Sequence, residues 1–149
     1  MRSMAALGSG LAGAVALNLV HEGIRRKWPS APRMDKLGMQ ALSAIIQKTG
    51  KQVPSKGELF GLTLAGDLIA NTLYYSLTGA KRPKSAWLKG PLLGAVAGLG
   101  ATLLPEKLGL SDEPANKTVK TSAMTIGLYV LGGIVAAGAL TLLERKLNK

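Results

Sequence analysis

Five polar residues recur along one apolar segment at spacings that place them on a single helical edge. Segment 59–77 is long enough and apolar enough to cross a bilayer, and Asp67 lies almost at its centre. Residues three and four positions apart are neighbours on a helix surface. The residues of this polar edge are Thr63, Asp67, Asn71, Tyr74 and Thr78.

A carboxylate at the middle of a bilayer costs roughly 2.5 to 3.5 kcal/mol on insertion scales, so Asp67 is expected to face other helices or water. Asn18 of the first apolar segment is the expected polar partner, and Tyr129 of the last one is either a second donor or a core residue. Asp67 would then bind a cation, exchange a proton or hold another helix. The alternative is that it only fixes helix register, although interhelical hydrogen bonds average roughly 0.6 kcal/mol.

A second group of ionisable residues, His21, Glu22 and Arg25, lies near the end of the first apolar segment. Glu22 with Arg25 or Arg26 is typical of an ion pair at the membrane interface, and a pH-sensitive His21 is the functional alternative. His21 is the only histidine and the chain has no cysteine. Multi-histidine, haem and thiolate sites within one chain are therefore excluded, and we expect no metal and no cofactor.

No catalytic motif accompanies these residues. The sequence has no phosphate-cradling glycine loop with its lysine and no serine in a nucleophile elbow. A membrane enzyme usually needs several ionisable groups that converge, whereas Asp67 is the one deep acid. We therefore predict that the protein is not an enzyme.

Small residues four positions apart form smooth strips on three of the apolar segments. Such strips let helix backbones approach closely in membranes, either within one chain or between copies. The residues predicted to pack helices in this way are Gly10, Ala14, Gly90, Gly94, Gly98 and Gly133.

These residues belong to an all-α fold, which we predict to be a polytopic integral membrane protein of one domain, residues 1–149. A transmembrane helix needs about 20 apolar residues. The four-helix transmembrane bundle comprises spans at about 4–27, 58–78, 86–104 and 120–144, and one additional amphipathic interfacial helix is expected at about 35–48.

Several boundaries have their own signals. Ser55 and Glu58 have the form of a capping box at the start of the second span, and Asp35 is a plausible N-cap of the interfacial helix. Pro91 leaves the third span open: a helix from Pro91, a longer kinked span, or a re-entrant piece. The first span resembles a signal peptide but is expected to be retained.

The formal net charge of +11 comes from Lys and Arg in short connections beside apolar segments. This distribution favours anionic lipid headgroups as partners, and the lack of interleaved aromatic residues disfavours nucleic acid. We expect a bacterial inner membrane protein. The first hypothesis is a non-enzymatic accessory or assembly subunit, or a homo-oligomer, that acts through helix association. The alternative is a minimal ion- or proton-coupled channel or transporter subunit that uses Asp67.

Overall fold

The computed structural model describes residues 2–79 and 83–147, and all the regular structure in these ranges is helical. The helices are α1 (Arg2–Lys27), α2 (Met34–Lys48), α3 (Lys56–Ser76), α4 (Pro83–Lys107), α5 (Glu113–Asn116) and α6 (Val119–Leu147).

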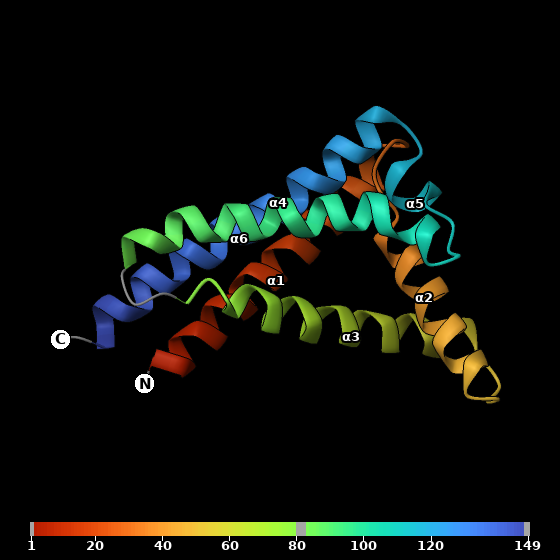
Figure 1. Cartoon of the computed structure of the whole chain (residues 1–149), viewed down its shortest axis with the longest axis horizontal. Coiled ribbons are helices and arrows are strands. Elements are labelled where there is room, and N and C mark those ends of the chain that lie inside the picture. Colours follow the sequence, from red (N-terminus) through yellow and green to blue (C-terminus); the bar gives the residue numbers. More distant parts are fainter. Residues whose placement is uncertain (1, 80–82, 148–149) are drawn as a thin grey trace.

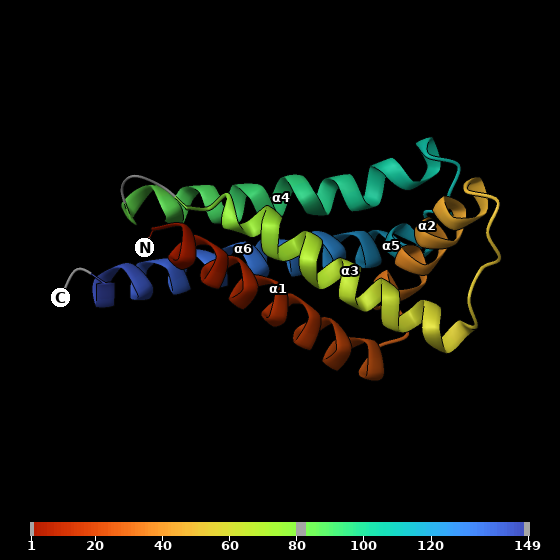
Figure 2. The ribbon, with the colours of Figure 1, turned by 90° about the horizontal axis from the view of Figure 1, so that it is seen from below.

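Four long helices run along the length of the molecule. Figures 1 and 2 show α1, α3, α4 and α6 arranged lengthwise, with α2 and the short α5 at one end and both chain termini toward the other. The most extensive contacts join α4 to α6, α6 to α1, and α1 to α3. Helix α3 therefore packs chiefly against α1, and α2 packs against α3.

Three of these helices, rather than the predicted four, are long and apolar enough to cross a membrane. They cover Ser3–Lys27, Ser85–Lys107 and Val119–Lys146. Helix α3 is not among them, because Asp67 and Asn71 interrupt its apolar sequence. By their length and composition, the three helices suggest an integral membrane protein.

The distribution of side chains between interior and surface fits this suggestion. Small and polar residues such as Ala14, Ala136 and Thr125 are fully buried, whereas Leu19 and Ile69 are 69% and 62% exposed. Helices in lipid pack through small residues and turn large apolar side chains outward, because hydrocarbon does not repel them. In water, so much exposed apolar surface would mark an interaction site.

Glycine contacts hold the long helices together within the chain. A Cβ atom at Gly90 would overlap Gly133, and one at Gly94 would overlap the Tyr129 carbonyl. A Cβ atom at Gly98 would lie 2.7 Å from Ile126 Cα, and one at Gly10 would overlap the backbone of α3. The small-residue strips thus lie at the α4–α6 and α1–α3 contacts.

Helix α4 rules out one of the alternatives left open by Pro91. It is one helix over Pro83–Lys107 that contains both Pro91 and Pro105, so a helix starting at Pro91 was wrong. Proline removes one backbone donor, which a membrane helix tolerates when neighbouring helices pack against it. Here Gly133 of α6 lies against Gly90 and Pro91.

Two further details differ from expectation, and one agrees. The N-cap of α2 is Arg33 rather than Asp35, whose carboxylate is engaged in ion pairs. The connection after α4 contains the unpredicted helix α5. The capping box at the start of α3 is confirmed: Ser55 N donates to Glu58 Oε2 at 3.1 Å, and Glu58 N donates to Ser55 Oγ at 3.5 Å.

Candidate functional site

Asp67 lies on the side of α3 that faces α1, and its carboxylate accepts hydrogen bonds from two side-chain amides. Asn71, one turn further along α3, donates from Nδ2 to Asp67 Oδ1 at 2.8 Å. Asn18 of α1 donates from Nδ2 to Asp67 Oδ2 at 3.0 Å, and the same nitrogen donates to the Ala14 carbonyl at 3.0 Å. The Asn18 Nδ2 atom thus faces two acceptors. This fixes the orientation of the amide, because its nitrogen can donate to both and its oxygen cannot.

The rest of the polar edge of α3 also turns toward neighbouring helices. Tyr74 Oη donates to the Leu93 carbonyl of α4 at 2.9 Å, and Thr78 is fully buried. Thr63 packs its methyl group against Gly38 of α2, and its buried hydroxyl has no hydrogen-bond partner among the described residues. The edge therefore faces the protein, while Ile69 on the far side is exposed.

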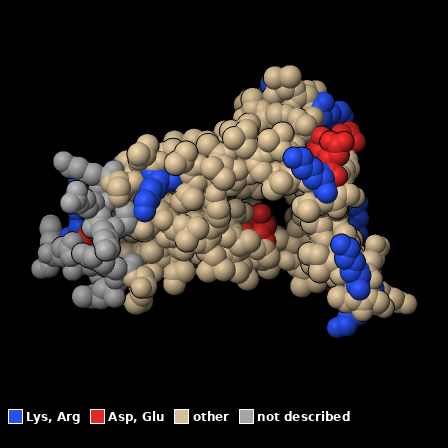
Figure 3. All heavy atoms as spheres, viewed as in Figure 1, with Lys and Arg blue, Asp and Glu red and all other residues tan. Residues whose placement is uncertain are grey.

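A cavity of about 860 Å³ lies beside Asp67, between α1, α2 and α3, and is called here the α1–α2–α3 cavity. Figure 3 shows a hollow in the surface between the body of the bundle and the end where α2 lies, with acidic atoms at its edge. Its walls are mostly apolar and are contributed by Leu17, Ala41, Ile45, Phe60 and Leu64, among others. Asp67, Asn18 and Tyr129 also line it.

Tyr129 shares the cavity with Asp67, but no hydrogen bond joins these two described side chains. The Tyr129 backbone is engaged instead, because its carbonyl accepts from Tyr75 Oη at 2.7 Å. Tyr75 is fully buried and was not predicted as a site residue, since it lies beside rather than on the polar edge.

Charged residues at one end of the cavity are paired with one another. Glu22 accepts from Arg25 at 2.7 Å and from Arg26 at 2.8 Å. Asp35 of α2 accepts from Arg33 at 2.7 Å, and Arg25 Nη1 lies 3.9 Å from the same carboxylate. These pairs connect the end of α1 to the start of α2.

The environment of Asp35 changes its ionisation. Burial alone would raise the pKa of Asp35, but hydrogen bonds from Arg33 and the charges of Arg33 and Arg25 outweigh burial, so the pKa is lowered. The same hydrogen bonds raise the pKa of Arg33. This pair therefore stays charged at neutral pH.

His21 has a structural contact rather than a place in a cluster of ligands. It is buried, and its Nε2 lies 2.9 Å from the Pro32 carbonyl in the linker between α1 and α2. Among the described residues, no group of three or more His, Asp or Glu side chains is gathered in a way that could hold a metal ion.

The charges around the cavity leave one carboxylate without a counter-charge. Arg25 and Arg26 line the cavity and are bound to Glu22, and Asp35 is bound to Arg33. Asp67 has only neutral amide partners, and no Lys, Arg or His of residues 2–79 and 83–147 forms a salt bridge with it. A desolvated carboxylate in this setting favours a positively charged partner or a proton.

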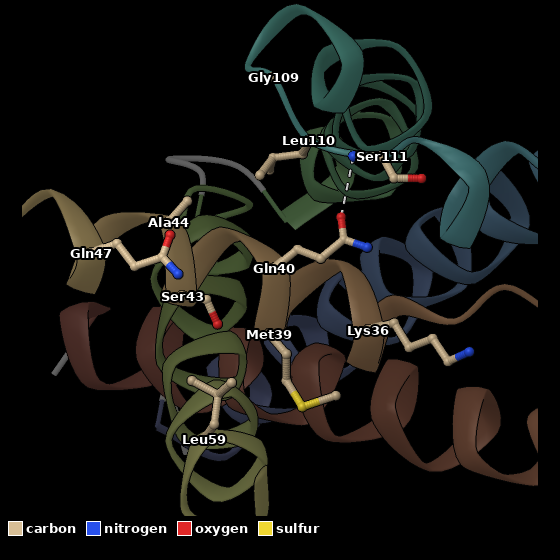
Figure 4. A pocket seen from close by; sticks show the side chains of 10 residues that line it. All are labelled: Lys36, Met39, Gln40, Ser43, Ala44, Gln47, Leu59, Gly109, Leu110 and Ser111. Atoms are coloured by element: carbon tan, nitrogen blue, oxygen red, sulfur yellow. Dashed lines mark hydrogen bonds between the residues drawn. The ribbon is translucent and has the colours of Figure 1, made fainter. Parts of the chain in front are cut away.

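A second pocket, of about 530 Å³, lies between α2 and the connection from α4 to α5. Figure 4 shows Gln40 reaching from α2 toward Ser111, whose backbone N–H donates to Gln40 Oε1 at 3.2 Å. Its polar lining consists of neutral side chains and Lys36, with no acid or histidine. The Gln40–Ser111 hydrogen bond at this pocket attaches α2 to the end of the bundle. The described residues of the lining include no acid or histidine that could perform acid–base chemistry.

The fold and site define a helical protein with three apolar helices, suggestive of membrane integration, and an acid outside any ion pair, Asp67, beside a cavity between α1, α2 and α3. Comparison with known proteins found no matching family model, no matching curated protein and no matching solved structure. Function must therefore be argued from the site.

The contribution of α2 to the site was missed from the sequence. Ala41, Leu42 and Ile45 line the cavity. Their helical spacing predicted an apolar face, but spacing alone did not reveal that this face lies beside the Asp67 edge of α3. In the structure, α2 meets α3 closely at Gly38, where a Cβ atom would lie 2.5 Å from Thr63 Cγ2. This close contact places the apolar face of α2 beside the polar edge of α3.

Proposed function

We infer that this chain is a non-enzymatic membrane protein, a minimal carrier or channel subunit in which Asp67 binds a passing cation or proton. The observation that supports this function best is the pairing of an uncompensated carboxylate with a cavity of about 860 Å³. Ionisable residues inside membrane proteins are expensive and typically mark substrate, ion or proton pathways.

The distribution of charge supports a membrane location, which we take to be the bacterial inner membrane. On the face shown in Figure 3, Lys and Arg lie toward the two ends, and a wide band between them is uncharged except for the acidic atoms at the hollow. Basic residues at the ends of apolar helices attract anionic lipid headgroups. In this arrangement α3 lies beside α1, and its polar edge faces α1 and the cavity between α1, α2 and α3.

Association through glycine faces has less support as the main role. The contacts at Gly90, Gly94, Gly98 and Gly133 are made between α4 and α6 of the same chain, and those at Gly10 between α1 and α3. These strips are therefore not available for a second copy or another protein. Oligomer formation stays a prediction, but it requires a different surface.

Flux through liposomes tests the proposed function. The wild type, Asp67→Asn and Glu106→Gln are each reconstituted, and proton and cation movement is followed with internal dyes. Glu106 is an exposed acid near the end of α4, so its variant removes one carboxylate outside the cavity. We expect flux above empty liposomes for the wild type and Glu106→Gln, and its loss for Asp67→Asn. Background flux from the wild type, or undiminished flux from Asp67→Asn, contradicts the proposal.

A further inference from the structure

We propose that the solute bound at Asp67 is a monovalent organic cation with apolar substituents, held in the α1–α2–α3 cavity. This inference rests on the proposed function, because it names the class of solute that the same carboxylate receives. It follows from the size of the cavity, its walls, the donors around Asp67 and the pairing of the nearby charges.

The size of the cavity suits an organic molecule. Pockets for small organic ligands usually enclose about 300 to 1,000 Å³, and this cavity measures about 860 Å³. A proton or a bare metal ion needs no such volume. The space beside the carboxylate is therefore matched to a ligand that has a body as well as a charge.

The walls of the cavity suit an apolar body. Leu17 of α1, Ile45 of α2 and Leu64 of α3 face the same space from three helices. Two aromatic residues, Phe60 and Tyr129, are also in the lining. Apolar groups gain from burial against such walls, and a positive charge is attracted to aromatic ring faces.

The groups around Asp67 do not suit a metal ion. Hard cations such as Ca²⁺ take six to eight oxygen ligands. The two side chains nearest to the Asp67 carboxylate, Asn18 and Asn71, both point amide nitrogens at it. An organic ammonium or phosphonium group needs only the single negative charge, because its remaining surface is satisfied by apolar contact.

An anionic ligand is disfavoured by the charges already present. Both arginines of the lining are bound to Glu22, and Asp67 repels a second negative charge. Among the described residues of the lining, Asp67 is the acid that stands outside any ion pair, whereas Arg25, Arg26 and Arg33 share Glu22 and Asp35 at one end of the cavity. A phosphate group placed beside Asp67 would face this carboxylate.

Binding of labelled tetraphenylphosphonium to the full-length protein in mild detergent tests this inference. We expect saturable binding that excess sodium chloride does not displace. Tetraphenylborate, which has nearly the same shape and the opposite charge, should not compete. Asp67→Asn should weaken binding by about tenfold or more, the usual consequence of losing a hydrogen-bonded or charged partner.

Two phenylalanine substitutions on α3 separate cavity filling from general effects. Both Ala70 and Ala65 are exposed, but only Ala70 lines the cavity. Ala70→Phe should weaken the binding of tetraphenylphosphonium but leave that of the smaller tetramethylammonium nearly unchanged. Ala65→Phe should change neither, which controls for the added ring.

The outcomes distinguish this inference from the proposed function. If Asp67-dependent flux is found but tetraphenylphosphonium fails to bind, or binds equally well to Asp67→Asn, the organic-cation inference is wrong and the proposed function stands. Displacement by sodium, or binding of tetraphenylborate with equal affinity, overturns the inference in the same way. If Asp67-dependent flux is also absent, the proposed function fails with it.

Discussion

Asn18 and Asp67 are joined across two helices by a 3.0 Å hydrogen bond that fixes how α1 and α3 face each other. Because the Asn18 nitrogen also donates to its own helix at Ala14, the amide is held in place before it meets the carboxylate. The bond thus orients the Asp67 carboxylate at the cavity wall while it helps to hold α3 against α1. Position and ionisation of the acid are therefore coupled to helix packing.

Removing both partners of this bond should cost less than the sum of the two single changes. In a double-mutant cycle of Asn18→Ala and Asp67→Ala, we expect a coupling energy of about 0.5 to 1.5 kcal/mol, the range for hydrogen bonds between membrane helices. Unfolding in detergent mixtures measures it. Asn18→Ala combined with Asp112→Asn, an acid outside the cavity lining, should show no coupling. A coupling of zero in both cycles would mean that the bond does not hold the two helices together.

Glycine substitutions in α4 and α6 should differ according to the space around each position. A Cβ atom at Gly94 would lie 2.6 Å from Val130 Cα, whereas one at Gly127 of α6 would meet nothing within 4 Å. Gly94→Ala should therefore lower the free energy of unfolding by about 1 to 3 kcal/mol, because backbones would have to separate. Gly127→Ala should raise it slightly, since alanine favours helix. Thermal unfolding in detergent compares them, and equal midpoints would contradict the close α4–α6 contact.

The inward polar edge of α3, its partner Asn18 and the capping box at Ser55 could all be foreseen, because each depends on helical spacing or on a local motif. The arrangement around the cavity could not. The position of α2 depends on the linker after Trp28, which turns at Pro29 and Ser30. The His21–Pro32 and Arg33–Asp35 contacts form there, and no periodic pattern specifies such contacts. Spacing identifies the face of a helix but not the helix that it meets.

The number of spans was misjudged for a related reason. The prediction treated the apolar residues of 58–78 as sufficient, whereas Asp67 and Asn71 interrupt the apolar run of α3, and only α1, α4 and α6 among the described helices contain a stretch apolar enough to cross a membrane. The polar groups that make this helix functionally interesting are those that weaken its signal as a span. Its place beside α1 depends on hydrogen bonds that its polar edge makes to other helices, such as the one from Asn18 to Asp67.

The ion pair at Asp35 should make stability depend on pH in the acid range. The pKa of Asp35 is lowered in the folded protein from its ordinary value of 3.8, so the pair stabilises the fold above that pH and loses its effect as pH falls through the lowered pKa. Asp35→Asn should therefore reduce stability at pH near 7 by about 1.5 kcal/mol. The difference from the wild type should shrink once the pH falls below that ordinary value.

Thermal midpoints of the two proteins across a pH series measure this difference. Comparison with Asp35→Asn removes the contributions that both proteins share. A difference that is constant from neutral to strongly acidic pH would show that the Asp35 charge has no role in stability.

The two tryptophans offer a test of how the bundle lies in a bilayer. Trp28 follows the end of α1 and Trp87 lies near the start of α4, and both are about half exposed, at 51% and 52%. Since α1 and α4 run in the same lengthwise direction (Figure 1), these residues lie toward opposite ends of the molecule. Tryptophan is enriched at membrane–water interfaces, so each should lie at the level of the headgroups on its own side.

Single-tryptophan variants, Trp28→Phe and Trp87→Phe, report the depth of the residue that each retains. In liposomes of brominated lipids, we expect the fluorescence of both variants to be quenched more by bromine near the headgroup than by bromine at mid-chain. Since both residues are at helix ends, a protein lying flat on the surface would also place them at shallow depth. A quencher confined to the outside of the vesicle separates the two cases: it should reach one tryptophan in a spanning bundle of uniform orientation and both in a surface-bound one. Quenching of both would contradict a membrane-spanning arrangement, and with it the passage of a cation past Asp67.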